Sequence, residues 1–289
     1  TGEPRFEIKQ TPVGRGFYRL PEPSKGDLFL DLEGDPSHPD GRLEYLFGMW
    51  DAKTSQYIEF WGHDQDEEKI AFESTIDFIT QRLIDEPDAH VYHYGHYEDT
   101  QLKRLCSQYS TREEEVDEIL RKERLVDLLK VTREAVRTSE SGSGLKALET
   151  FFMQGGRTAS IQKADDSVVL YSEWMQSGDQ SLLDAIREYN REDCVSTMQC
   201  RDWLIGLKPA GIQPFSSEPF DPSQQKKATS SVQTLIEQLL ANAPPGEVDV
   251  RQLAGQLTMF HQRANRPAWF QYFSRSELSE DELIDSAEC

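Results

Sequence analysis

Two carboxylates stand two positions apart at Asp31 and Glu33, directly after an apolar run and before a Gly-Asp-Pro turn signal at 34–36. Side chains alternate between the faces of a strand, so both acids are expected to point to the same side. Two like charges this close repel each other, and a cation between them relieves the repulsion. The pair therefore indicates a metal site. A strand end that runs into a polar turn is the alternative.

A second polar segment, HYGHYED at 93–99, follows an expected strand. A small residue lets the chain turn here, and an aromatic residue precedes Glu98 and Asp99, which would open a helix. Acids at a helix start interact favourably with the helix dipole, which by itself accounts for both. His93 and His96 lack a second clear pair of zinc ligands, so we expect them to line the site or its rim.

The third candidate lies in YNREDC at 189–194. In a helix, Tyr189 and Asp193 are four residues apart and share a face. A phenol beside a carboxylate can position a water molecule that a metal on the carboxylate activates. A helix with a buried tyrosine explains the same pattern without any chemistry.

Positive charge gathers between residues 121 and 146, where seven Lys or Arg stand against four Asp or Glu. The whole chain of 289 residues has 31 Lys or Arg, 52 Asp or Glu and a net charge of −21, so this stretch differs from the rest. Together with the hydroxyl-rich loop SESGSG at 139–144, it is suited to holding a phosphate backbone. A surface of mixed charge is an equally good interpretation.

The pattern of apolar residues predicts which elements position these groups. Short apolar or aromatic runs indicate strands at 27–33, 45–50, 56–61 and 89–94. Helices are expected at 66–84, 98–109, 112–122, 144–153 and 180–206. Three meandering strands continued by strand–helix units predict an α/β fold, a mixed sheet flanked by helices in the order of an RNase H-like fold. A fifth strand is not evident.

Composition divides the chain into four expected parts. Residues 1–25 form an N-terminal extension that packs on the surface, 26–208 the sheet domain, 209–229 a linker, and 230–289 a helical C-terminal segment with patterns at 230–241 and 248–262. The chain opens with Thr-Gly-Glu and no methionine. We therefore expect it to be a piece of a longer protein.

Several classes of protein are excluded by composition. The net charge of −21 disfavours bulk attraction to nucleic acid, so DNA binding would need a locally positive groove. The four cysteines show no CxxC spacing, and no GxxxxGK[ST] loop is present to hydrolyse ATP. No run approaches the roughly 20 apolar residues of a membrane helix, and no signal peptide opens the chain. We expect a cytoplasmic enzyme without membrane contact.

Taken in chain order, the three motifs resemble the DEDD exonuclease superfamily in its tyrosine variant, over residues 26–207. In that superfamily four carboxylates bind two divalent metals, and the tyrosine orients the attacking water. The resemblance implies four metal-binding and catalytic acids and one catalytic tyrosine, namely Asp31, Glu33, Glu98, Asp193 and Tyr189.

The middle motif departs from the usual pattern of that superfamily, which has Asn, two or three residues, Phe or Tyr, and then Asp. Here His93 stands at the Asn position, Tyr97 is the aromatic residue and Glu98 follows it directly. We therefore assign Glu98 as the ligand, with Asp99 as the secondary candidate.

Longer segments of the sequence resemble a more specific group of proteins. FLDLEGDP, LEYLFG, VYHYGHYE, LKRL, LKALE and YNREDC are similar to the RNase H-like nuclease module of bacterial RecB-like nuclease–helicase proteins. The resemblance implies an N-terminal RecB-like nuclease region and a C-terminal helicase region on the same parent polypeptide, with the tail at 266–285 leading into the helicase. It also implies that Asp127 and Lys146 lie near the active site.

The resemblance implies 3′→5′ removal of nucleotides from single-stranded DNA, in DNA repair or processing. Oxygen-only ligands favour two Mg²⁺ or Mn²⁺ ions over zinc. Lys146, Tyr97 and His96 are expected to bind the substrate, and Tyr94 and Tyr97 are placed to stack on terminal bases or to pack in the core. A strand-guiding module without activity is the main alternative, and an RNA exonuclease is a third.

Overall fold

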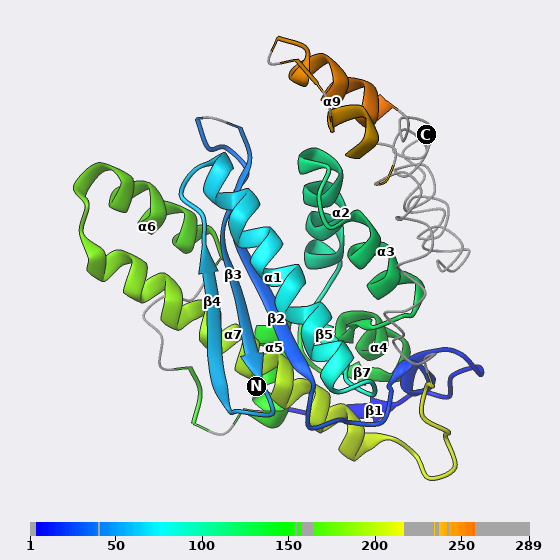
Figure 1. Cartoon of the computed structure of the whole chain (residues 1–289). Helices are drawn as coiled ribbons and strands as arrows, with labels where there is room; N and C mark the ends of the chain where they lie inside the picture. Colours follow the sequence, from blue (N-terminus) through cyan, green and yellow to red (C-terminus); the bar gives the residue numbers. More distant parts are fainter. Residues whose placement is uncertain are drawn as a thin grey trace, which may run out of the picture. The chain divides into compact units, whose positions relative to one another are not determined.

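The computed structural model describes residues 4–39, 41–153, 155–157, 164–216, 234, 237–241, 243–244 and 246–257. The chain divides into two compact units, Thr1–Leu105 with Thr111–Phe220, and Cys106–Ser110 with Asp221–Cys289. All expected site residues belong to the first unit, which contains the sheet (Figure 1).

A five-stranded mixed sheet forms the centre of the first unit. Its strands, in the spatial order β4-β3-β2-β5-β6, are β4 (Gln56–Trp61), β3 (Leu43–Asp51), β2 (Leu28–Asp35), β5 (Val91–His93) and β6 (Leu125–Asp127). β2 pairs antiparallel with β3 and parallel with β5, and β5 pairs parallel with β6. The mixed sheet predicted from the sequence is therefore confirmed. β6 is the strand that was not evident, because three residues are too few to show an alternation.

Helices cover both faces of this sheet. They are α1 (Gln65–Asp85), α2 (Tyr97–Tyr109), α3 (Glu113–Arg121), α4 (Leu128–Ala135), α5 (Leu145–Phe152), α6 (Ala164–Ser177) and α7 (Gln180–Leu207). Figure 1 shows α1 in front of the sheet and α7 behind it. α4 and α6 were not among the expected helices, and the others agree with their predicted spans within two residues.

Local chemistry explains where the long helices begin. Asp64 precedes α1, and its side chain accepts a hydrogen bond of 2.8 Å from the backbone N–H of Glu67. Asp179 precedes α7 and accepts one of 3.0 Å from Ser181. Such caps satisfy N–H groups that have no partner within the helix. The start of α7 is thus fixed nine residues before Tyr189.

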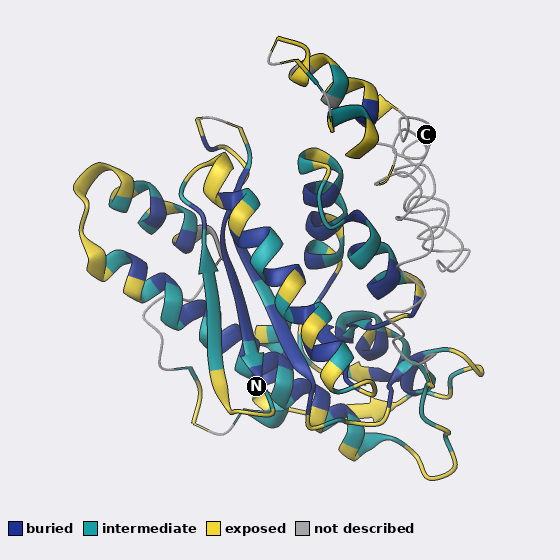
Figure 2. Ribbon diagram, in the orientation of Figure 1, coloured by how far each residue is buried: buried dark blue, intermediate teal, exposed yellow. Residues whose placement is uncertain are grey.

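The hydrophobic core lies between the sheet and the helices, and Figure 2 shows the central strands β2 and β3 buried and the outer helix faces exposed. Here the structure differs from the expectation that residues 1–25 only pack on the surface. Phe17 and Leu20 are fully buried in one cluster with Phe29 of β2 and Tyr92 of β5. Because many Pro and Gly residues surround these two apolar residues, the sequence did not indicate that they belong to the core.

The remaining N-terminal residues and the start of the expected linker also belong to the first unit. β1 (Phe6–Ile8) pairs antiparallel with β7 (Val136–Thr138), and η1 (Gly16–Arg19) is a short 3-10 helix. The N–H of Phe215 donates to the carbonyl of Leu20 at 3.0 Å. The boundary expected at 208/209 stays a prediction, and residues 217–229 of the linker lie outside the described residues.

The described part of the second unit includes α9 (Val248–Leu257), which falls within the helical pattern expected at 248–262. Residues 237–240 are also helical, within the pattern at 230–241. The rest of both patterns and the tail from 258 lie outside the described residues. Among the helices described, none has the length and apolar character needed to cross a bilayer.

A buried ion pair joins α7 to the beginning of β2. Nη1 of Arg201 donates to Oδ2 of Asp27 at 2.6 Å, and both side chains are almost fully buried. The guanidinium lies 4.9 Å and 5.1 Å from the ring centroids of Phe29 and Tyr92. Removing one partner of such a pair leaves a buried charge uncompensated.

We therefore expect Arg201→Ala to lower the free energy of unfolding by about 3–5 kcal/mol, measured by urea denaturation. Arg187→Ala is the matched control on the same helix, because Arg187 pairs with Glu59 at 2.7 Å while 38% exposed. A half-exposed pair contributes about 1 kcal/mol or less. Equal losses for the two variants would contradict this account of how α7 is held.

Candidate active site

Three carboxylates converge where α7 crosses β2. Asp31 and Glu33 come from the strand and Asp193 from the helix, and each offers an oxygen within 4.8 Å of the others. Asp31 and Glu33 share a face because one residue separates them in the strand, as the alternation predicted. In the part of the chain that the structure describes, these three residues are the only group of acids, His or Cys this close together.

Asn190, on α7, holds Asp31 in place. Its Nδ2 donates to Oδ2 of Asp31 at 2.7 Å and to the Asp31 carbonyl at 3.2 Å. Its Oδ1 accepts from the hydroxyl of Tyr57 on β4 at 2.8 Å. A Cβ atom on Gly48 of β3 would lie 1.7 Å from this Oδ1, so only glycine leaves room for the amide. Sequence reasoning missed Asn190, although it stands directly after Tyr189.

Glu33 is held from another direction. The hydroxyl of Ser167, on α6, donates to Oε2 of Glu33 at 2.7 Å, and the hydroxyl of Tyr45, on β3, donates to Ser167 at 3.1 Å. Sequence reasoning missed this serine too. No pattern in the sequence pointed to it, because α6 itself was not expected.

Two cations lie beside the acids. Nη2 of Arg157 contacts both Asp193 and Glu149 of α5. Lys146, at the start of α5, donates to the hydroxyl of Tyr189 at 2.8 Å, and its Nζ lies 4.5 Å from the centroid of that ring. Lys146 was expected near the active site, and the structure brings it there. Arg157 was not singled out in the sequence.

Burial raises the pKa values of these acids, and neighbouring negative charge adds to the effect at Asp31 and Glu33. Burial, and then the charges of Asp193, Glu33 and Glu98, hold the pKa of Asp31 well above its usual range. Burial and the charge of Asp193 raise the pKa of Glu33 to about 8. Burial also raises the pKa of Asp193, against the lowering effect of Arg157. Carboxylates with raised pKa values are suited to binding a divalent cation, because its positive charge stabilises their ionised form.

Glu98 lies beside this group rather than within it. It is buried at the start of α2, and its Oε2 lies 3.4 Å from Nδ1 of His93. Burial disfavours the imidazolium of His93, but the carboxylates of Glu98, Asp127 and Asp99 together outweigh that effect and raise the pKa of His93. Asp99 pairs instead with Lys103 at 2.6 Å, one turn along α2. Of the two acids, Glu98 is the one whose charge acts on Asp31.

The other expected residues make contacts outside the three carboxylates. The hydroxyl of Tyr97 donates to Glu44 at 2.8 Å, and the guanidinium carbon of Arg42 lies 5.5 Å from the centroid of its ring. Tyr97 is thus engaged by neighbouring side chains. His96 is exposed. Asp127 precedes α4 and accepts hydrogen bonds from backbone N–H groups, including that of Gly95 at 2.9 Å, so it fixes the turn after β5.

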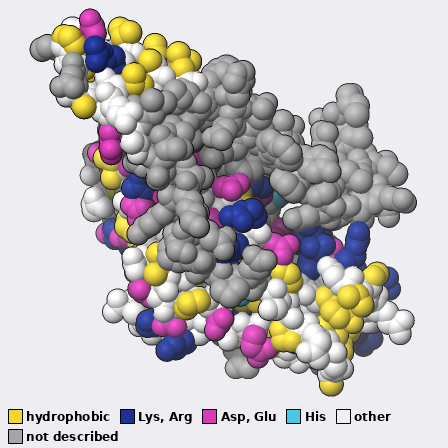
Figure 3. Space-filling view, turned by 45° about the vertical axis from the view of Figure 1, so that its right-hand side comes forward, with side chains coloured by type: hydrophobic (Ala, Val, Ile, Leu, Met, Phe, Trp, Pro, Cys, Tyr) yellow, Lys and Arg dark blue, Asp and Glu magenta, His cyan; other side chains and the backbone are white. Residues whose placement is uncertain are grey.

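The basic stretch at 121–146 is partly internal. Arg124 is 1% exposed and donates to the carbonyl of Ala89 at 3.2 Å, and Lys122 is 5% exposed beside Glu118. Two of its positive charges therefore contribute little to a surface for phosphate. On the face drawn in Figure 3, acidic and basic side chains are interspersed.

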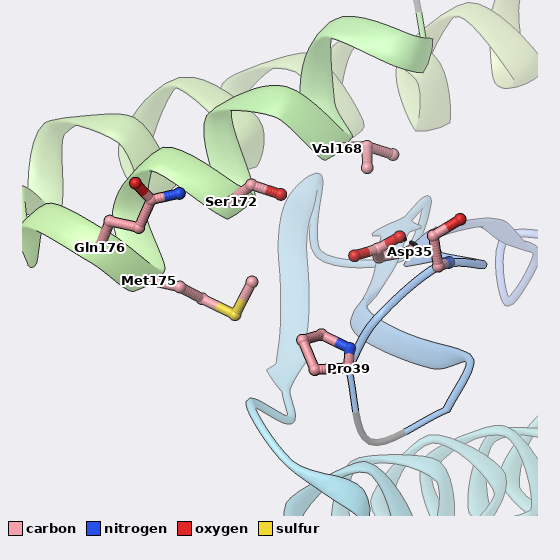
Figure 4. Close-up of a pocket in the computed structure, with 7 residues that line it drawn as sticks. Asp35, Pro39, Val168, Ser172, Met175 and Gln176 are labelled. Atoms are coloured by element: carbon pink, nitrogen blue, oxygen red, sulfur yellow. Dashed lines mark hydrogen bonds between the residues drawn. The ribbon is translucent and has the colours of Figure 1, made fainter.

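A cavity of about 480 Å³ opens between α6 and the loop after β2. Figure 4 shows Val168, Ser172, Met175 and Gln176 of α6 on one side and Pro39 and Asp35 on the other. Asp35 is two residues beyond Glu33, and Val168 follows Ser167. The cavity therefore adjoins the segments that hold the carboxylates.

A mixed sheet with helices on both faces, and acids on its central strand facing the long helix α7, defines an α/β protein with an acidic site. The family model described as the RNase H superfamily matches residues 28–205, and the chain belongs to that superfamily. No curated protein and no solved structure matches the chain. The matched range contains the whole carboxylate group. The family and the acidic group together support a nuclease-type hydrolase that binds divalent metal.

The close approach of Asn190 to Gly48 leads to a first prediction for this site. Gly48→Ala must displace the amide and release Asp31, because the added Cβ has no space. We expect the increase in melting temperature on adding Mn²⁺ to fall to less than half that of the wild type. Gly206→Ala in the last turn of α7 is the control, since a Cβ there meets nothing within 4 Å. An unchanged Mn²⁺ response in Gly48→Ala would contradict the role of Asn190.

The raised pKa of Glu33 leads to a second prediction. A divalent ion must displace the Glu33 proton, so Mn²⁺ affinity should rise with pH up to about 8 and then level off. Without metal the sign is opposite. An acid whose pKa rises from 4.5 to about 8 on folding stabilises the protein fully below pH 4.5, and this contribution is lost as the pH rises through about 8.

Melting temperatures in EDTA and in Mn²⁺, measured between about pH 6 and pH 9, test both effects. We expect the value in EDTA to fall with pH and the gain from Mn²⁺ to grow. In Glu33→Gln the decline in EDTA should be smaller, because glutamine does not titrate. A gain from Mn²⁺ that is the same at both ends of the range would refute the assignment of Glu33.

Proposed function

We propose that this chain is a tyrosine-type DEDD exonuclease that removes nucleotides from the 3′ end of single-stranded DNA with two Mg²⁺ or Mn²⁺ ions. The observation that carries the proposal is the meeting of Asp31, Glu33 and Asp193, with Tyr189 one turn before Asp193 on the same helix. Glu98 is close enough to raise the pKa of Asp31 and is the fourth acid of the proposed set.

The four acids would hold the two ions, which supply a clamp on the attacking and leaving oxygens of an in-line displacement at phosphorus. The donor set is made of oxygen alone, which suits Mg²⁺ or Mn²⁺. Asn190 and Ser167 orient Asp31 and Glu33 from behind, so the acids need little rearrangement to bind.

Tyr189 would orient the attacking water as a neutral phenol. Burial and the charges of Asp193, Glu33 and Asp31 raise its pKa, so it does not act as the base. Lys146 donates to its oxygen, and the phenol itself hydrogen-bonds to Asp193, so both groups fix its orientation. A carboxylate of the site would then have to take the proton from the water.

The strand-guiding module remains the second candidate function, because Glu98 interacts with His93 and Asp193 with Arg157 in the structure. The two candidates differ in what they require of the acids. A nuclease needs Asp31 for turnover, whereas a binding module keeps or gains affinity for DNA when Asp31 becomes alanine.

The cellular setting is proposed from the resemblance alone. It comprises RecB-like nuclease and helicase regions on the parent polypeptide and a role in DNA repair or processing. The cytoplasmic location is proposed from composition instead. Comparing DNA and RNA oligonucleotides of the same sequence would distinguish an RNA exonuclease from the proposed enzyme.

The deciding assay uses single-stranded DNA labelled at either end, in Mn²⁺, Mg²⁺ or EDTA. We expect shortening from the 3′ end that requires metal and falls roughly 100-fold or more in Asp31→Ala and Asp193→Asn, because a metal stabilises the transition state by several kcal/mol. If the DNA stays intact with every metal while the gel shift is retained, the exonuclease is rejected and the strand-guiding module is favoured.

Glu98→Gln and Asp99→Asn form a matched pair for the middle motif. We expect Glu98→Gln to lower the cleavage rate at least about 10-fold, because it removes a charge next to Asp31. Asp99→Asn should stay within about twofold of the wild type, since Asp99 is paired with Lys103 on the helix surface. The reverse order would make Asp99 the ligand.

A further inference from the structure

Arg157 keeps one buried nitrogen without a partner in the middle of the site. Its side chain is 9% exposed. Nε donates to both oxygens of Glu149 at 3.0 and 2.9 Å, and Nη2 contacts Glu149 and Asp193. Nη1 is buried with no hydrogen-bond partner among the described residues. A buried donor without a hydrogen bond is unfavourable, so Nη1 is suited to binding a ligand acceptor.

The guanidinium is built into the site rather than resting on its surface. Glu149, which holds it, is itself fixed by the hydroxyl of Ser196 on α7, which donates to its Oε1 at 2.7 Å. The guanidinium carbon lies 5.8 Å from the centroid of the Tyr189 ring. Arg157 is therefore held next to the proposed water-orienting residue by side chains of two helices.

The carboxylates alone would repel a phosphodiester. A guanidinium matches the geometry of a phosphate and keeps its charge at every working pH. Because Glu149 binds both Nε and Nη2, Arg157 stays anchored when Asp193 turns to a metal ion. An internal counter-ion alone would not explain why Nη1 points to no carboxylate.

We propose that Arg157 binds the phosphate that is cut, with Nη1 donating to a non-bridging oxygen. This inference rests on the proposed function and adds a substrate-binding residue to it. Glu149 acts as the positioning residue that aims the guanidinium.

The test measures binding of an oligonucleotide in EDTA, where no metal holds the phosphate. Two single-stranded DNAs are compared, one natural and one with a methylphosphonate at the 3′-terminal linkage, which removes the charged oxygen. We expect wild-type protein to bind the natural strand roughly 10-fold or more tightly than the modified one, and Arg157→Ala to bind both equally. Arg187→Ala, on the outer part of α7, is the control and should behave as the wild type does.

Arg157→Lys guards against misfolding, because it keeps the charge between Glu149 and Asp193 but loses the planar fork. It should melt near the wild-type temperature and prefer the natural strand by only a few-fold. Full discrimination between the two strands in Arg157→Ala would overturn the proposal. So would unchanged DNA affinity with tighter Mn²⁺ binding, which would make Arg157 a counter-ion of the acids.

The outcomes also separate this inference from the proposed function. Wild-type cleavage together with strand discrimination that survives in Arg157→Ala rejects the role of Arg157 and leaves the exonuclease. If no metal supports cleavage but strand discrimination depends on Arg157, the exonuclease is rejected and the phosphate contact is retained. If neither cleavage nor strand discrimination is observed, both the exonuclease and the role of Arg157 are rejected.

Discussion

The close crossing of α7 over the central strands is the constraint on which the site depends. α7 brings Asp193 to within reach of Asp31 and Glu33 only because Gly48 leaves space for the amide of Asn190. The same helix is held at its other end by the buried pair of Arg201 with Asp27. Packing thus places like charges together, at an electrostatic cost that a bound cation would offset.

Opposite charge around the acids comes from a different part of the chain. Lys146 and Arg157 lie on α5 or shortly after it, and they contact Tyr189 and Asp193 of α7 respectively. The acid Glu149 of α5 holds Arg157 and accepts a hydrogen bond from Ser196 of α7. The centre therefore has an acidic half on β2 and α7 and a basic half on the α5 side. Such a division suits a substrate that brings a negative phosphate to metal ions. The acidic half would then contact the metal ions, and the basic half would contact the phosphate.

Much of the fold was predictable because its signals are local. Apolar runs predicted β2, β3 and β4, and helical spacing predicted α1 and α7. β6 has three residues, too few for a period, and α6 was overlooked although it holds Ser167. The buried role of Phe17 and Leu20 depends on contacts with β2 and β5, which are remote in the chain. Short elements and distant contacts were therefore the ones that sequence reasoning missed.

The sequence by itself determined which side chains share a face. One intervening residue in a strand aligns Asp31 with Glu33, and one helical turn aligns Tyr189 with Asp193. Only the tertiary structure decided which faces meet, that Glu98 rather than Asp99 turns inward beside His93, and that Asn190, Ser167 and Arg157 complete the site. The reason is physical: spacing along a chain fixes direction within one element, whereas contact between elements depends on how their packed surfaces fit.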